Sequence, residues 1–166
     1  MSARSALDGA PITVLDLRDS PWVDGPGRTV LDCASGLDPA RIRVVVGTFD
    51  SGRGEPSAYA LEARRRGLEV AVVRERRSLD PGVLGQILRL IDHHAVDIVH
   101  THDFRSDLFG LVAARLKRRA IVGTAHGWIA NDRKSRWTTA LDKRLLKSMD
   151  LVIAVSAATR RLLIDD

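Results

Sequence analysis

The chain has 166 residues, of which 45% are hydrophobic and 28% charged, a composition that excludes disordered and fibrous proteins. Its length fits about one domain, and its one cysteine, Cys33, excludes an internal disulfide. The 26 basic and 21 acidic residues give a net charge of +5, which favours phosphates, nucleic acid or anionic lipid without choosing among them. No apolar stretch is long enough for a membrane span, and residues 1–17 lack the continuous apolar segment of a secretory signal.

Short apolar stretches rich in branched residues alternate with stretches of helical spacing along the chain. The apolar stretches predict six buried strands, at residues 12–17, 43–49, 69–73, 97–101, 120–124 and 150–155. Helices are expected between them, at residues 28–37, 57–66, 80–95 and about 103–116. A fifth helix should carry Trp137, Leu141, Leu145 and Met149 in one row at spacing i, i+4, and a last helix should begin at Ser156.

Strands that are nearly all apolar and alternate with helices predict a parallel sheet covered on both faces. We therefore expect an α/β, Rossmann-like, doubly wound domain of about six strands over residues 12–166, preceded by a tail at residues 1–11. The expected strand order is 3-2-1-4-5-6, and ligands of such sheets bind at the carboxyl ends of the strands, where the order reverses. That rule directs attention to the segments after Leu17 and after Thr101.

The first candidate segment, residues 24–28 (DGPGR), opens the first expected helix. Gly25 and Gly27 let a backbone approach a ligand, the helix N-terminus favours a phosphate, and Arg28 adds a charge-assisted contact. A plain loop punctuated by proline and glycine is the alternative. A dinucleotide fingerprint fails here, because Val30 stands where the third glycine should fall.

The second segment follows the fourth strand. His100 and His102 share one face of that strand, and His102 and Asp103 lie at its carboxyl end, where they could bind a polar ligand. The alternatives are that Asp103 caps the next helix and that His102 is a buried, satisfied polar group. A zinc site is not indicated, because no cysteine or further acid falls at ligand spacing, and no metal ligands are expected.

The third segment follows the fifth strand, where His126 could donate a hydrogen bond or transfer protons near neutral pH. A structural histidine is the alternative, and Thr124 in the same segment is a candidate for substrate binding. Ser156 could cap the last helix, which is compatible with a ligand contact. The basic residues at 133–147, with Trp137 among them, could meet anionic lipid headgroups, whereas no nucleic-acid recognition motif accompanies the charge.

Three motifs, in this order and spacing, resemble the N-terminal domain of family 4-type glycosyltransferases of the GT-B fold. They are DIVHTHDFRSDLFGLVAARL at residues 97–116, VGTAHGW at 122–128 and DLVIAVSAATRRLL at 150–163. The resemblance implies two Rossmann-like domains that face a cleft, the first for the acceptor and the second for a nucleotide-sugar donor. It also implies sugar transfer with retention of configuration and without a metal.

Carried onto this sequence, the resemblance places His126 near the transferred sugar as the catalytic candidate, and His102 and Asp103 near the acceptor. Ser156 matches a serine that closes the sixth strand. In the first loop only Gly25 matches the family's glycine pair directly, while Gly27 stands where a glutamate is common and Arg28 matches a frequent arginine. The substrate-binding candidates are Gly25, Gly27, Arg28, His102, Asp103, Thr124 and Ser156.

The sequence ends at residue 166, before any donor-binding domain with its E-x7-E motif. We therefore expect an acceptor-binding half, inactive alone, that needs a C-terminal domain or a partner chain and uses a nucleotide sugar as co-substrate, with no permanently bound cofactor. Polysaccharide biosynthesis, a cytoplasmic location and peripheral contact with an anionic membrane surface are expected with it. The alternatives are a non-catalytic module for an anionic glycan, lipid headgroup or partner transferase, and a dinucleotide-dependent enzyme, ranked last because the glycine pattern fails.

Overall fold

The computed structural model describes residues 9–50, 56–77, 79–127 and 133–164, with the side chains of 133–136 left out. Along the chain the elements are β1 (Ile12–Arg18), α1 (Gly25–Gly36), β2 (Ile42–Asp50), α2 (Ala58–Arg65), β3 (Glu69–Arg74), α3 (Pro81–His93), β4 (Ile98–Thr101), α4 (Phe104–Lys117), β5 (Ala120–Ala125), α5 (Arg133–Lys147), β6 (Leu151–Ala154) and α6 (Ala157–Ile164). The strands and helices alternate as the sequence predicts. Among the described helices, none is long and apolar enough to cross a membrane.

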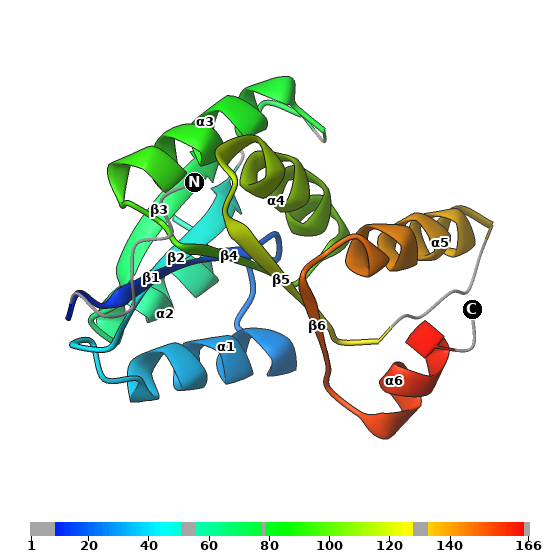
Figure 1. Ribbon diagram of the computed structural model, residues 1–166, viewed down its shortest axis with the longest axis horizontal. Coiled ribbons are helices and arrows are strands. Elements are labelled where there is room, and N and C mark those ends of the chain that lie inside the picture. Colours follow the sequence, from blue (N-terminus) through cyan, green and yellow to red (C-terminus); the bar gives the residue numbers. More distant parts are fainter. Residues whose placement is uncertain (1–8, 51–55, 78, 128–132, 165–166) are drawn as a thin grey trace.

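All six strands are parallel and lie in the order β3-β2-β1-β4-β5-β6, which confirms the predicted doubly wound sheet. Helices α1 and α2 cover one face, and α3, α4 and α5 cover the other (Figure 1). The order reverses between β1 and β4, because β2 and β3 extend from one side of β1 and β4 to β6 from the other. The carboxyl ends of β1 and β4 therefore meet at the switch point.

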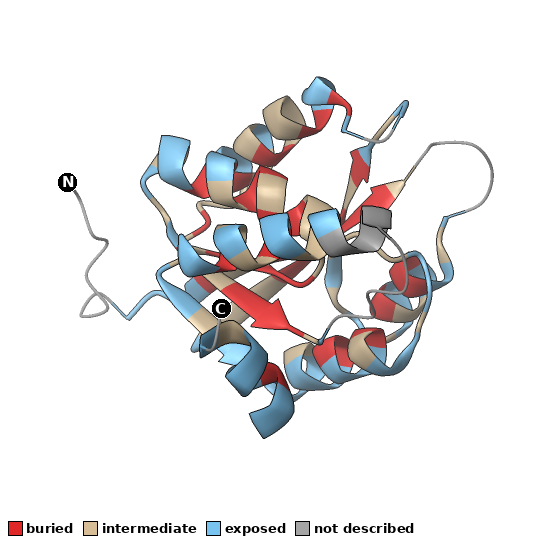
Figure 2. Cartoon of the chain, turned by 90° about the vertical axis from the view of Figure 1, so that its right-hand side faces the viewer, coloured by how far each residue is buried: buried red, intermediate tan, exposed pale blue. Residues whose placement is uncertain are grey.

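Strand β1 sends alternate side chains to the two faces of the sheet. Leu15 and Leu17 are fully buried in the core beneath α3 and α4. Asp16 and Arg18 alternate with them and point to the opposite face, where Arg18 reaches the ring of Tyr59 on α2. Figure 2 shows the buried residues gathered on the strands and on the helix sides that face them. Two charged side chains are thus built into a central strand of the core.

Helix α1 begins at Gly25, three residues before the predicted start at Arg28, so Gly25 and Gly27 lie in its first turn rather than in a loop. Asp24 is the N-cap, and its Oδ1 accepts the backbone N–H of Gly27 at 2.8 Å. A proline in the first turn adds a fixed φ that suits a helix start. The cap and the proline together outweigh the turn tendency of the two glycines.

The apolar row predicted for α5 is only partly its buried face. Trp137 and Leu141 are 71% and 49% exposed, whereas Leu146 is 1% exposed. Helix α5 packs on α4 and over β5, where Gly123 leaves room for Leu146 and Met149. A Cβ on Gly123 would lie 2.6 Å from the Leu146 side chain and 2.5 Å from that of Met149. The buried side of α5 is therefore decided by this close approach to the sheet.

Candidate functional site

A cluster of polar side chains surrounds Asp16 on the α1 face of the sheet. The pairing of β1 with β4 sets Asp16 opposite His100. Its Oδ2 lies 3.2 Å from Nδ1 of His100 and 3.0 Å from Nε2 of His102. Burial raises the pKa of Asp16, but the two histidines outweigh burial and hold that pKa well below its usual range. Asp16 is therefore an ionised carboxylate at the centre of the sheet.

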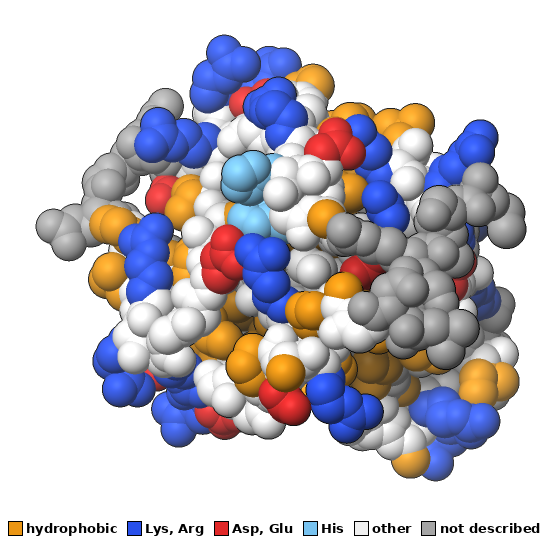
Figure 3. Space-filling model, turned by 60° about the vertical axis from the view of Figure 1, so that its left-hand side comes forward, with side chains coloured by type: hydrophobic (Ala, Val, Ile, Leu, Met, Phe, Trp, Pro, Cys, Tyr) orange, Lys and Arg blue, Asp and Glu red, His pale blue; other side chains and the backbone are white. Residues whose placement is uncertain are grey.

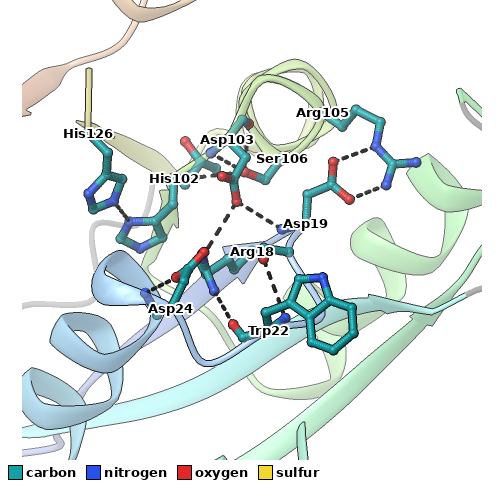
Figure 4. Close-up of polar contacts among 12 residues, drawn as sticks. Arg18, Asp19, Trp22, Asp24, His102, Asp103, Arg105, Ser106 and His126 are labelled. Carbon is teal, nitrogen blue, oxygen red and sulfur yellow. Dashed lines mark hydrogen bonds and ion pairs between the residues drawn. The ribbon is translucent and has the colours of Figure 1, made fainter. Parts of the chain in front are cut away.

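The cluster continues from Asp16 in two directions. His102 Nδ1 lies 3.2 Å from Nε2 of His126, at the end of β5 (Figure 4). His100 Nε2 lies 2.7 Å from Oγ1 of Thr124. Burial, followed by the nearby His102 and Arg18, lowers the pKa of His126 to about 4. A line of hydrogen-bonding groups thus runs through the protein to His126, which is neutral at pH 7.

Arg18 holds the segment before α1 in place. Its side chain is 2% exposed, and its Nη1 donates to the backbone oxygen of Trp22 at 2.9 Å. Its Nη2 donates to both carboxylate oxygens of Asp24, at 2.7 and 2.8 Å (Figure 4). Because Asp24 also accepts the Gly27 N–H, one carboxylate both neutralises the buried arginine and caps the helix. Arg18, at the end of β1, therefore fixes the position of the α1 N-terminus.

Asp103 ties the exit of β1 to the start of α4. It is the N-cap residue of α4, as predicted, yet its Oδ2 accepts the backbone N–H of Asp19 at 3.0 Å. Oγ of Ser106 in turn accepts the N–H groups of Asp103 and His102, at 3.0 and 3.2 Å. Burial raises the pKa of Asp103 above its ordinary value. Arg105 completes this corner with ion pairs to Asp19 and Glu75.

The structure brings several predicted residues together and leaves others apart. His102 and His126 are in direct contact, and Thr124 joins them through His100 and Asp16. Both ring nitrogens of His102 are engaged within the protein, so the structure shows the buried, satisfied alternative, and a substrate contact by His102 stays a prediction.

The glycines and Arg28 take different places. A Cβ on Gly25 would have nothing within 4 Å, whereas one on Gly27 would lie 2.5 Å from Nη1 of Arg18. Arg28 lines a groove of about 680 Å³ formed by α1, α2 and the segment before α1. None of the residues that line this groove belongs to the histidine cluster.

Ser156 behaves as the helix cap that its position predicts. Its Oγ accepts the backbone N–H of Thr159 at 3.0 Å, in the first turn of α6. A Cβ on Gly127, next to His126, would lie 3.7 Å from Oγ1 of Thr159. The start of α6 is thus a neighbour of the segment that follows β5. Trp128, the last residue of the VGTAHGW motif, lies outside the described residues.

Asp16 and Arg18 are the site residues that sequence reasoning missed. A signal was present in the sequence, since Asp16 and Arg18 are charged residues in a strand whose other residues predict burial. A buried charge requires a partner, so these two residues could have been expected to contact other polar groups. No metal site was expected from the sequence, but Asp16 lies with His100 and His102, and the possible ligand atoms of these three residues are all within 4.8 Å of one another. In this structure those same atoms are within hydrogen-bond distance inside the cluster.

The charge of the surface is mixed. On the face shown in Figure 3, Lys and Arg side chains are spread among acidic and hydrophobic ones and form no continuous basic stripe. Many of the basic groups are paired, as in Arg43–Glu69, Arg66–Asp32 and Lys117–Asp92. Ion pairs thus neutralise part of the basic charge, and this face gives no sign of a nucleic-acid surface.

The parallel six-stranded sheet with helices on both faces is the architecture of one Rossmann-like half of a GT-B glycosyltransferase. The model of Glycosyltransferase Family 4 matches residues 23–166, and the chain belongs to that family. A search of curated protein sequences found no relative.

Solved structures share the fold at low sequence identity. HepE of Anabaena, solved in complex with UDP and glucose, is 20% identical, with a TM-score of 0.75 over 93% of this chain and 41% of that one. A glycosyltransferase of Rickettsia africae is 19% identical, with a TM-score of 0.68 over 94% and 40%. MurG of Acinetobacter baumannii is 15% identical, with a TM-score of 0.65 over 90% and 42%. The chain thus spans about two fifths of the length of each of these proteins.

Proposed function

We propose that this chain is the acceptor-side half of a retaining glycosyltransferase that moves a sugar from a nucleotide-sugar donor to a glycan or lipid-linked acceptor. The donor-binding half is supplied by further polypeptide or by a partner chain, and the chain is inactive alone. Membership of glycosyltransferase family 4 supports sugar transfer in general. Structural neighbours solved with UDP and with UDP-glucose support a nucleotide-sugar co-substrate.

The observation that carries the proposal is the placement of His126. It follows β5 at the carboxyl edge of the sheet, where ligands of open α/β sheets bind. Its pKa of about 4 keeps the ring neutral at pH 7. A sugar in transfer develops positive charge at its anomeric carbon, and a neutral imidazole hydrogen-bonds the sugar without repelling that charge. His126 is therefore the group assigned to the transferred sugar.

The two glycines in the first turn of α1 have different roles. The surroundings of Gly25 are open, so its backbone is free to approach a phosphate or the acceptor. Gly27 instead provides the space that Arg18 needs, and its N–H already donates to Asp24. Anion binding at this helix N-terminus is accordingly assigned to Gly25, and Gly27 supports it by keeping Arg18 and Asp24 in place.

The test compares three preparations for sugar transfer and donor hydrolysis with several nucleotide sugars: the chain alone, the polypeptide encoded directly downstream, and both together. We expect robust transfer only from the combination, with the anomeric configuration of the donor retained in the product when followed by NMR. His126→Asn should lower turnover of the combination by about 10²–10³-fold. His93→Asn, which changes an exposed histidine of α3, should not.

Each part of the proposal has its own contradicting result. Robust turnover by the chain alone would refute the need for a second half. An inverted product would refute retention, and full activity of His126→Asn would remove His126 from the reaction.

A further inference from the structure

The groove of about 680 Å³ lies between α1 and α2, which cover the same face of the sheet (Figure 1). Its volume is in the range of sites for small ligands. Val23, just before α1, and Ala58, the first residue of α2, line one end of it. The backbone N–H of Tyr59 donates to the oxygen of Pro21 at 3.0 Å and holds the two helix starts together. Because these helices begin where β1 and β2 end, this end of the groove lies at the carboxyl edge of the sheet.

The two acids that line the groove are already bound by arginines. Arg66 bridges the helices, with Nη1 2.5 Å from Oδ1 of Asp32 on α1 and Nε 2.8 Å from Oε1 of Glu62 on α2. Arg65 donates to both carboxylate oxygens of Glu62, at 2.7 and 2.8 Å. The hydrogen bonds from Arg65 and Arg66 lower the pKa of Glu62 to about 2. Both carboxylates thus have cationic partners within the groove, which disfavours a cationic ligand.

Arg28 is the remaining cation of the groove. It lies one turn before Asp32 in α1, but Asp32 is paired with Arg66. Arg28 is exposed, and the described part of the chain gives its side chain no hydrogen-bond or ion-pair partner. Three arginines against two acids leave the groove with a net charge of +1, at Arg28. A free guanidinium offers paired N–H donors that suit a carboxylate, sulfate or phosphate, so the groove favours a ligand with an acid group.

The rest of the groove suits a saccharide better than a hydrocarbon chain. Five of the eight residues that line it are charged, and a hydrocarbon would remove their water without replacing its hydrogen bonds. Sugar hydroxyls replace that water, because they donate to carboxylates such as Asp32 and Glu62 and accept from a guanidinium such as Arg65. Leu61, which is 47% exposed, offers an apolar surface to the C–H groups of a sugar ring.

We propose that the groove between α1 and α2 binds an acidic saccharide, with its carboxylate, sulfate or phosphate at Arg28 and its rings over Leu61. The inference rests on the proposed function, which makes this saccharide part of the acceptor, and it names the acceptor class as anionic. One end of the bound saccharide lies at the carboxyl edge of the sheet, the edge that also carries His126.

The test is an NMR titration of the ¹⁵N-labelled chain, which requires no sugar transfer. The acidic probes are a galacturonate trimer, a sulfated galactose tetrasaccharide and mannose 6-phosphate. A glucose trimer is the neutral control, and inorganic phosphate is the control for a free anion. We expect at least one acidic probe to shift the amide signals of α1 and α2 and to bind about tenfold more tightly than either control.

Arg28→Gln should weaken the binding of that probe by about tenfold, because the charge-assisted contact is lost. Leu61→Ser should also weaken it, through loss of the apolar contact with the sugar ring. Arg89→Gln makes the same change at an exposed arginine of α3, which covers the opposite face of the sheet, and should bind as the wild type does.

The inference is overturned if no acidic probe binds more tightly than the glucose trimer, or if inorganic phosphate binds as tightly as the saccharides. Wild-type affinity of Arg28→Gln, or shifts confined to other elements, would overturn it as well. In the active combination of chain and downstream polypeptide, Arg28→Gln should raise KM for an acidic acceptor by about tenfold with little change in kcat. Binding in the groove without any sugar transfer would refute the proposed function alone. Transfer with the same KM in wild type and Arg28→Gln would refute the groove alone.

Discussion

The guanidinium of Arg18 occupies the space that a side chain on Gly27 would need, because a Cβ built on Gly27 would lie 2.5 Å from Nη1. Arg18 has no room to withdraw, since it is 2% exposed and bonded to Trp22 and Asp24. A glycine that looks in sequence like a ligand-binding glycine is thus required by the packing of a buried arginine.

Gly27→Ala should therefore lower the free energy of unfolding by about 1–3 kcal/mol, the usual cost of forcing an extra methyl group into a packed site. Chemical denaturation measures this loss. Gly25→Ala is the matched control in the same helix turn, where the added methyl meets nothing within 4 Å, and it should be neutral or slightly stabilising. Equal stability of the two variants would contradict the assigned contact.

Substitution of Arg105 should lower the free energy of unfolding more than substitution of an exposed arginine. Its Nε donates to Asp19 and its Nη1 to Glu75, each at 2.5 Å, and the three side chains are 15–20% exposed. Arg105→Gln leaves two partly buried carboxylates without their cation, and we expect a loss of about 1.5–3 kcal/mol in denaturation experiments. Arg65→Gln, at a side chain 72% exposed, should have little effect on stability, because solvent weakens an exposed ion pair. A loss no larger at Arg105 than at Arg65 would argue against its anchoring role.

Asp107 should make the stability of the protein fall as pH rises. Burial raises the pKa of this carboxyl, Thr101 partly offsets the rise, and Asp142 adds to it. Because the folded pKa lies above the unfolded value of 3.8, the folded state holds a proton that the unfolded chain releases above that pH. Asp107→Asn has no such proton, so its stability relative to wild type should increase from pH 4 toward neutrality.

The expected change between these conditions is on the order of 1–3 kcal/mol, followed by urea unfolding at several pH values. Parallel pH profiles of Asp107→Asn and wild type would show that Asp107 is ionised in the folded protein.

Peripheral membrane contact would depend on α5, where Trp137 is 71% exposed and Leu141, Arg144 and Lys147 are exposed as well. An exposed tryptophan flanked by basic side chains suits an anionic interface. Trp137→Ala should lower the affinity for vesicles of phosphatidylcholine and phosphatidylglycerol by about tenfold, measured by how much protein floats with the vesicles. Trp22→Ala, at a ring 68% exposed before α1, is the control and should float as the wild type does. Identical flotation of all three proteins would remove α5 from membrane binding.

The sequence by itself determined the architecture. Alternating apolar and helical stretches predicted the six strands, and the chirality of parallel connections reduced their arrangement to the observed order. It also located His126, Asp103 and Ser156 at the ends of elements, because position relative to a strand end or helix start is a local property. The predicted start of α1 was three residues too late, because Gly25 and Gly27 favour a loop and the capping by Asp24 was not recognised.

Only the tertiary structure decided what surrounds these residues. Asp16 meets His100 and His102 because β1 pairs with β4, across a separation of 84 to 86 residues that no local spacing reveals. The role of Gly27 likewise appears only once Arg18 is placed beside it. Local periodicity is fixed by the backbone geometry of each element, whereas the partner of a buried charge is fixed by which strands lie side by side.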